Sequence, residues 1–187
     1  MKLSDEFELL TLSEGLAAEA FVELADFGIR LDRITGAPVA ELRRLVSEGR
    51  GAPLFHRGEP AGFLRTAHEQ DPSLQASVLL ENLACKATAV MATARVLRDG
   101  TVGPEQVDYL LNSGEEAVGD RYQRGAGSLS KAVGEVVGCV NATGADIKAF
   151  CAAPVHALIM ASAMVAAGLH RYVVVLGGGA QAKLGMK

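Results

Sequence analysis

The sequence predicts an α/β protein built around a largely parallel β-sheet. Three short apolar segments, "QVDYLLNSG", "DIKAF" and "RYVVVLGG", are typical of buried strands, and a helix-like segment lies between each pair. Strands that alternate with helices are joined by right-handed crossovers and therefore run parallel. A chain of 187 residues is long enough to bury the core of one good-sized domain.

Residues 1–50 are expected to form a helical lead-in. The segments "LAAEAFVELADFG" and "APVAELRRLVSEG" carry apolar residues three and four positions apart and end at Gly28 and Gly49. The following segment, "PLFHRGEPAGFLRTA", has two extended runs around Gly58-Glu59-Pro60, which predicts a hairpin.

Residues 51–187 are expected to form the main domain. Asp71-Pro72 offers a cap and a first-turn proline for a long helix that ends at Gly100. A shorter helix, "SLSKAVGEVVG", separates the first two strands, and a helix over residues 152–167 separates the last two. The small residues of that last helix predict a buried central helix, against which neighbouring elements approach closely.

Composition argues against several classes of protein. Hydrophobic residues make up 49% of the chain, charged residues 21%, and the net charge is −4, as in an ordinary soluble, cytoplasmic protein. Because no basic stripe is present, we expect no nucleic-acid partner. The acidic start, "MKLSDEFELL", does not resemble an export signal.

One segment approaches the length of a membrane span. Residues from Cys151 to Leu169 contain no Asp, Glu, Lys or Arg, and a spanning helix needs about 20 apolar residues. The segment nevertheless includes Pro154, His156 and Ser162 and is mostly alanine. It is therefore interpreted as a buried helix of a soluble protein, with no membrane partner.

Cys151 is the candidate catalytic residue. It falls between a predicted strand and the first turn of a helix, where unpaired N–H groups and the helix dipole favour a thiolate and can hold an oxyanion. The alternative is a small buried hydrophobic residue, which is how Cys85 and Cys139 are interpreted. The three cysteines lack metal-ligand spacing, so we expect no disulfide framework, no metal and a reducing compartment.

The segments around Cys151 resemble the N-terminal half of a thiolase-superfamily enzyme of the ketoacyl synthase III kind. The closer resemblance is to the thiolase-like chain of component C of glycine, sarcosine and betaine reductase complexes. It is carried by "ENLACKATAVMA", "GEEAVGDRYQRGAGSLSKA", "GCVNATGADIKAFCAAPVHAL" and "VVVLGGGAQAKLGMK", which cover residues 75–187 almost without interruption.

The resemblance implies a role in handling a two-carbon acyl unit. A carboxymethyl group on a selenocysteine of a partner protein would become an acetyl thioester on component C, and phosphate would release acetyl phosphate. Cys151 matches the position of the superfamily's nucleophile. The superfamily takes its catalytic histidine and a second polar residue from the C-terminal half, so we expect this chain to be half of an acyltransferase-type unit.

The same resemblance implies partners. These are a second subunit of the complex, a selenoprotein carrier and a further copy of the chain in a homodimer. The dimer contact is expected near "GEEAVGDRYQRGAG" and the start of the Cys151 helix. No cofactor is expected.

Other residues are weaker site candidates. His156 lies five residues after Cys151, about 140° round a helix, and is interpreted as a core, interface or substrate-channel residue. Glu116, Arg121 and Arg124 belong to a dense polar segment that either is solvated or lines the site or the dimer contact. Gly178 lies in the turn after the last strand and is a further candidate for the site or interface.

Two other hypotheses remain. The thiolase-like core would be a non-catalytic scaffold that binds the subunit performing thioester chemistry. Alternatively, "RGAGSLS" before a helix would be a dinucleotide turn, with an acidic ribose partner near Asp146.

Overall fold

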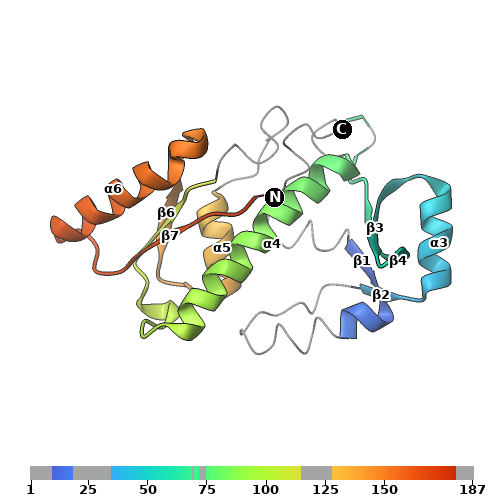
Figure 1. Cartoon of the computed structure of the whole chain (residues 1–187), viewed down its shortest axis with the longest axis horizontal. Coiled ribbons are helices and arrows are strands. Elements are labelled where there is room, and N and C mark those ends of the chain that lie inside the picture. Colours follow the sequence, from blue (N-terminus) through green and yellow to red (C-terminus); the bar gives the residue numbers. More distant parts are fainter. Residues whose placement is uncertain (1–9, 19–34, 69, 72–74, 115–127, 180–187) are drawn as a thin grey trace.

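The computed structural model describes residues 10–18, 35–68, 70–71, 75–114 and 128–179. Within them lie two small sheets, one formed by the first part of the chain and one by the last (Figure 1). A long helix, α4 (Ala76–Asp99), runs between the two sheets.

The first sheet has the strand order β2-β1-β4-β3. Its strands are β1 (Leu10–Ser13), β2 (Thr35–Ala37), β3 (Gly51–His56) and β4 (Glu59–Arg65). The β3–β4 hairpin confirms the predicted one, and β1 pairs antiparallel with β4 and parallel with β2. The sheet therefore joins the expected lead-in to the expected main domain.

The lead-in is helical only in part. Helix α3 (Val39–Glu48) is confirmed, and residues 14–18 are helical, but residues 19–34 lie outside the described part. Strands β1 and β2 are not among the predicted elements. In β1 the alternation Leu-Thr-Leu-Ser is the signature of a half-buried strand, because Leu10 and Leu12 face the core.

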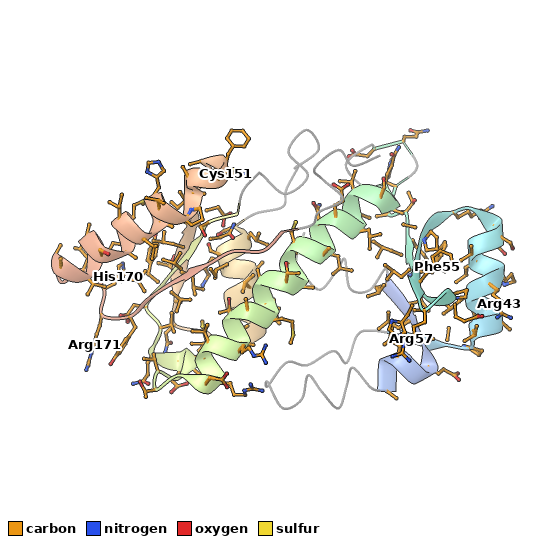
Figure 2. The ribbon with its side chains drawn as sticks, in the orientation of Figure 1. Arg43, Phe55, Arg57, Cys151, His170 and Arg171 are labelled. Atoms are coloured by element: carbon orange, nitrogen blue, oxygen red, sulfur yellow. The ribbon has the colours of Figure 1, made fainter. Side chains whose placement is uncertain are left out.

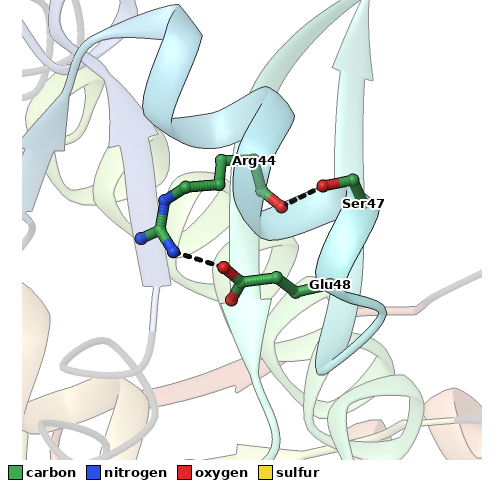
Figure 3. A network of polar contacts seen from close by, with 3 residues as sticks. All are labelled: Arg44, Ser47 and Glu48. Atoms are coloured by element: carbon green, nitrogen blue, oxygen red, sulfur yellow. Dashed lines mark hydrogen bonds and ion pairs between the residues drawn. The ribbon is translucent and has the colours of Figure 1, made fainter.

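Helix α3 carries a local network on its exposed side (Figure 3). Arg44 pairs with Glu48 one turn later, and the Ser47 hydroxyl donates to the Arg44 carbonyl oxygen at 2.6 Å. The helix ends at Gly49, whose φ of 68° is left-handed. Exposed pairs of this kind contribute little to stability, so the network marks a solvated face.

The second sheet has the order β6-β5-β7, and all its strands are parallel. They are β5 (Tyr109–Asn112), β6 (Thr143–Asp146) and β7 (Val173–Leu176), connected through α5 (Leu129–Val137) and α6 (Ala153–Ala166). Helices α4 and α5 cover one face and α6 the other (Figure 1). The predicted α/β class, parallel sheet and helix order are confirmed.

The middle strand of the sequence prediction is displaced. The segment "DIKAF" is predicted to be a strand, whereas β6 is "TGAD" and ends at Asp146. Gly144 explains the position, because a Cβ there would lie 2.5 Å from the Leu110 carbonyl oxygen. Only glycine allows β6 to come this close to β5. The strand therefore includes Gly144 and ends at Asp146.

Helix α4 joins the two cores. Leu79 and Leu83, in its first half, pack with Leu10, Leu12 and Leu64 of the first sheet. Further along, Ala89, Val90 and Ala94 belong to a larger cluster with α5 and the second sheet. One helix therefore uses successive parts of its length to bury two separate apolar faces.

Helix α6 is not buried as expected. Ala153 and Ala157 are fully buried against the sheet, but Leu158 is 56% exposed and Ile159 61%. The helix is apolar all round, and within the described residues only its inner face is covered. No helix in the described part of the chain combines the length and apolarity that a membrane span requires.

Candidate functional site

Cys151 lies at the carboxyl-terminal edge of the parallel sheet. The chain leaves β6 at Asp146, passes through residues 147–149 and forms a single 3₁₀ turn, Phe150–Ala152, that leads into α6 (Figure 2). Ligands of open α/β sheets bind outside the carboxyl ends of the strands. The thiol therefore occupies the edge where such a fold places its chemistry.

The backbone turns sharply just before the thiol. Phe150 has a φ of 49°, a left-handed conformation, and the residue is 70% exposed. For a residue with a Cβ this conformation costs about 1–2 kcal/mol. Strain of this kind persists only where the surrounding structure enforces it, and it is common at active sites.

The three cysteines differ in accessibility. Cys151 is exposed, whereas Cys85 and Cys139 are 3% and 1% exposed. Burial raises the pKa of the Cys139 thiol; nearby Lys131 lowers it by a smaller effect. The interpretation of Cys85 and Cys139 as packed thiols is confirmed.

The start of α6 has no side-chain cap. Its N-cap residue is Ala152, and Pro154 occupies the first turn. The N–H groups of Ala152 and Ala153 donate within the 3₁₀ turn to the carbonyl oxygens of Ala149 and Phe150. These two N–H groups therefore already have acceptors, and neither is available to bind an oxyanion beside Cys151.

Two polar residues at the end of β5 were missed by sequence reasoning. The Ser113 hydroxyl donates to the Leu176 carbonyl oxygen at 2.9 Å, tying β5 to β7. Asn112 is 5% exposed, and its Oδ1 atom is buried without a hydrogen-bond partner. The only available signal was a polar pair directly after the apolar run "YLL".

Asp146 serves as a helix cap. Its carboxylate accepts the N–H groups of Leu129 and Ser130, both at 2.9 Å, at the start of α5. A dinucleotide phosphate would need this same helix N-terminus. Because a carboxylate already occupies it, the geometry contradicts the nucleotide hypothesis.

The other candidates are scattered. His156 is exposed on α6, and His170 lies beyond the far end of that helix, with its ring 4.7 Å from that of Tyr109 (Figure 2). Gly178 lies against α4, where a Cβ would come within 2.1 Å of the Cys85 carbonyl oxygen. Glu116, Arg121 and Arg124 lie outside the described residues. The described residues contain no group of three metal-ligating side chains.

No family model matches the chain. It is 40% identical over 190 residues to "Glycine/sarcosine/betaine reductase complex component C subunit beta" from Peptoclostridium acidaminophilum. The chain is a homologue of this subunit. The match covers the whole of this chain and 37% of the component C subunit, so the chain spans little more than a third of that relative's length.

A solved structure is also similar. The priming β-ketosynthase of the R1128 polyketide biosynthetic pathway shares 31% identity with this chain. The similarity covers 48% of this chain and 25% of the ketosynthase, with a TM-score of 0.43.

Proposed function

We propose that this component C homologue transfers an acetyl group as a thioester and that Cys151 is the nucleophile. The observation that carries the proposal is the position of Cys151, an exposed thiol at the carboxyl edge of a parallel sheet, directly after a residue in a left-handed conformation. The 40% identity to a component C subunit over the whole chain supports the same role.

The proposed step is an acyl exchange between two sulfur atoms. The Cys151 thiolate attacks the carbonyl carbon of a thioester, a new C–S bond forms, and the electron pair of the C=O bond moves to oxygen. When the carbonyl re-forms, the old C–S bond breaks and the departing thiolate takes up a proton. The N–H group of Cys151 itself is the proposed donor to the oxyanion, because a backbone N–H beside the nucleophile can reach the oxygen of the carbonyl that is attacked.

The acetyl thioester formed on Cys151 would then react with phosphate. A phosphate oxygen attacks the acetyl-Cys151 carbonyl carbon, acetyl phosphate leaves, and the Cys151 thiolate is restored. The acetyl thioester is the substrate of this exchange, and the selenocysteine-bound carboxymethyl group that the family resemblance implies lies upstream of it, before a separate reductive cleavage of the Se–C bond. His156 lies five residues after Cys151, about 140° round a helix, and the other three histidines lie outside α6, so in this proposal the general acid or base comes from other parts of the functional unit.

Intact-mass measurement after incubation with an acetyl thioester tests the nucleophile. The wild-type chain, in complex with its partner subunits, should gain one acetyl group that maps to Cys151. Cys151→Ser should gain none and should fold normally, because it changes one atom at an exposed position. Ala152→Ser is the matched control and should still be acetylated; loss of labelling in both variants, or undiminished labelling in Cys151→Ser, would contradict the proposal.

A non-catalytic scaffold is the second candidate function. The exposed apolar face of α6, which includes Leu158 and Ile159, favours it because such a surface suits subunit contact. Alkylation at neutral pH separates the two functions. Cys151 modified much faster than an ordinary exposed thiol supports a nucleophile, and reactivity equal to that of a small reference thiol supports a scaffold.

A further inference from the structure

The first sheet borders a pocket that the proposed acyl chemistry does not use. The pocket has a volume of about 460 Å³ and is formed by the end of β1, the start of α3 and the β3–β4 hairpin turn. Leu16, Val39 and Pro60 provide apolar wall, and Ser13, His56 and Arg57 provide polar groups. This volume lies in the lower part of the range of small-molecule sites.

The charge of the pocket is positive. Glu59 also lines it, but its carboxylate lies 2.6 Å from the Arg43 guanidinium, which offsets the negative charge. None of the ion pairs found within the described residues involves Arg57. The Arg57 guanidinium therefore provides an uncompensated positive charge at a pocket that His56 also lines.

The backbone holds Arg57 in an unfavourable conformation. Its φ is 51°, and the following Gly58 has a φ of 83°, so both central residues of the hairpin turn are left-handed. Turns of this kind strongly prefer Asn, Asp or Gly at both positions. Arginine is a costly choice for the turn itself, which points to a use for its side chain.

We infer that this pocket binds a small organic anion, a carboxylate or phosphate with a short apolar part. The Arg57 guanidinium would hold the oxyanion through charge-assisted hydrogen bonds, and Leu16, Val39 and Pro60 would cover the apolar part. Arg57 and Cys151 lie on opposite sides of α4 (Figure 2), so this site is separate from the thiol. The inference does not depend on acyl transfer at Cys151.

Titration calorimetry on the full chain tests the site with three probes: butyrate, inorganic phosphate and butylammonium. Butyrate and phosphate distinguish a carboxylate from a phosphate site, and butylammonium has the same apolar part as butyrate with the opposite charge. We expect at least one anion to bind and butylammonium not to bind. Absence of binding by both anions, or equal binding of butylammonium, would overturn the inference.

Arg57→Asn should affect stability and anion affinity differently. Asparagine suits the left-handed turn, so the melting temperature without ligand should stay the same or rise, while anion affinity should fall about tenfold or more. Arg44→Gln, which removes an exposed arginine on α3, should leave affinity unchanged. Arg57→Gly is a second variant in case asparagine disturbs the hairpin. Unchanged anion affinity in the folded Arg57 variants would locate the binding elsewhere and overturn the inference.

Discussion

At the scale of single residues, the structure gives unexpected roles to small and polar side chains. Gly178 is a sequence-based candidate for the site or interface, and in the structure it allows the segment after β7 to lie directly on α4. The N–H group of the neighbouring Gly179 donates to the Thr88 hydroxyl oxygen at 3.1 Å, which fixes the same contact. The pair of glycines thus sets the position of the chain as it leaves the sheet.

Gly178→Ala should destabilise the fold by about 1–3 kcal/mol. An added Cβ would lie 2.1 Å from the Cys85 carbonyl oxygen and 2.8 Å from the Ala89 nitrogen, and neither backbone atom can move without distorting α4. Urea unfolding measures the loss. Gly179→Ala is the matched control, because a Cβ there meets nothing within 4 Å. Equal stability of the two variants would show that the close approach is absent in solution.

At the scale of elements, single carboxylates fix the connections between helices and strands. Asp146 caps α5, and Asp108 accepts the N–H groups of Arg171 and Tyr172 at 2.7 and 2.8 Å. The second contact holds the turn between α6 and β7 at the amino-terminal edge of the sheet. It lowers the pKa of Asp108, chiefly through the Tyr172 bond and then the Arg171 bond.

The Asp108 contact should make stability depend on pH. A carboxyl group whose pKa is lower in the folded state stabilises the fold at pH values above its unfolded pKa. This contribution is lost as the pH falls through the lowered, folded pKa. Asp108→Asn should therefore be less stable than wild type at neutral pH, and the difference should shrink in acid.

Urea unfolding across the acidic range measures that difference. Glu135→Gln, which changes an exposed carboxylate on α5, serves as the control and should show no such trend. If the difference in unfolding free energy between wild type and Asp108→Asn stayed constant with pH, the ionised Asp108 carboxylate would not be the group that makes this contact.

At the scale of the whole molecule, the largest unexplained feature is the outer face of α6. Val155, Leu158, Ile159 and Val165 are all exposed, on a helix whose opposite face is packed on the second sheet. Exposed apolar groups of this density are typical of interaction surfaces. The face begins one turn after Cys151, so whatever covers it would lie next to the thiol.

The chain should associate into a homodimer or a larger assembly through this face. Leu158→Glu should shift the population toward monomer at low micromolar concentration and leave the monomer folded, because residue 158 faces away from the sheet core. Light scattering measures the mass. Val140→Glu, at an exposed apolar position after α5, controls for added charge. A wild-type particle of monomer mass would contradict the proposed association.

Elements whose signals are local can be predicted from the sequence. The apolar periods of α3, α4 and α5, the turn of the β3–β4 hairpin and the valine run of β7 depend on neighbours within a few residues. Each is predicted close to its observed place. The position of Cys151 before a helix follows in the same way, because a strand, a short turn and an alanine-rich helix succeed one another along the chain.

Other features of the fold depend on contacts between segments that are distant in the sequence. The position of β6 depends on Gly144 fitting against Leu110, and the pairing of β1 with β4 joins segments about fifty residues apart. The pocket beside Arg57 exists because α3 and the hairpin turn meet there. Such contacts depend on which surfaces meet across the fold, and a periodic pattern along one segment carries no information about its partner.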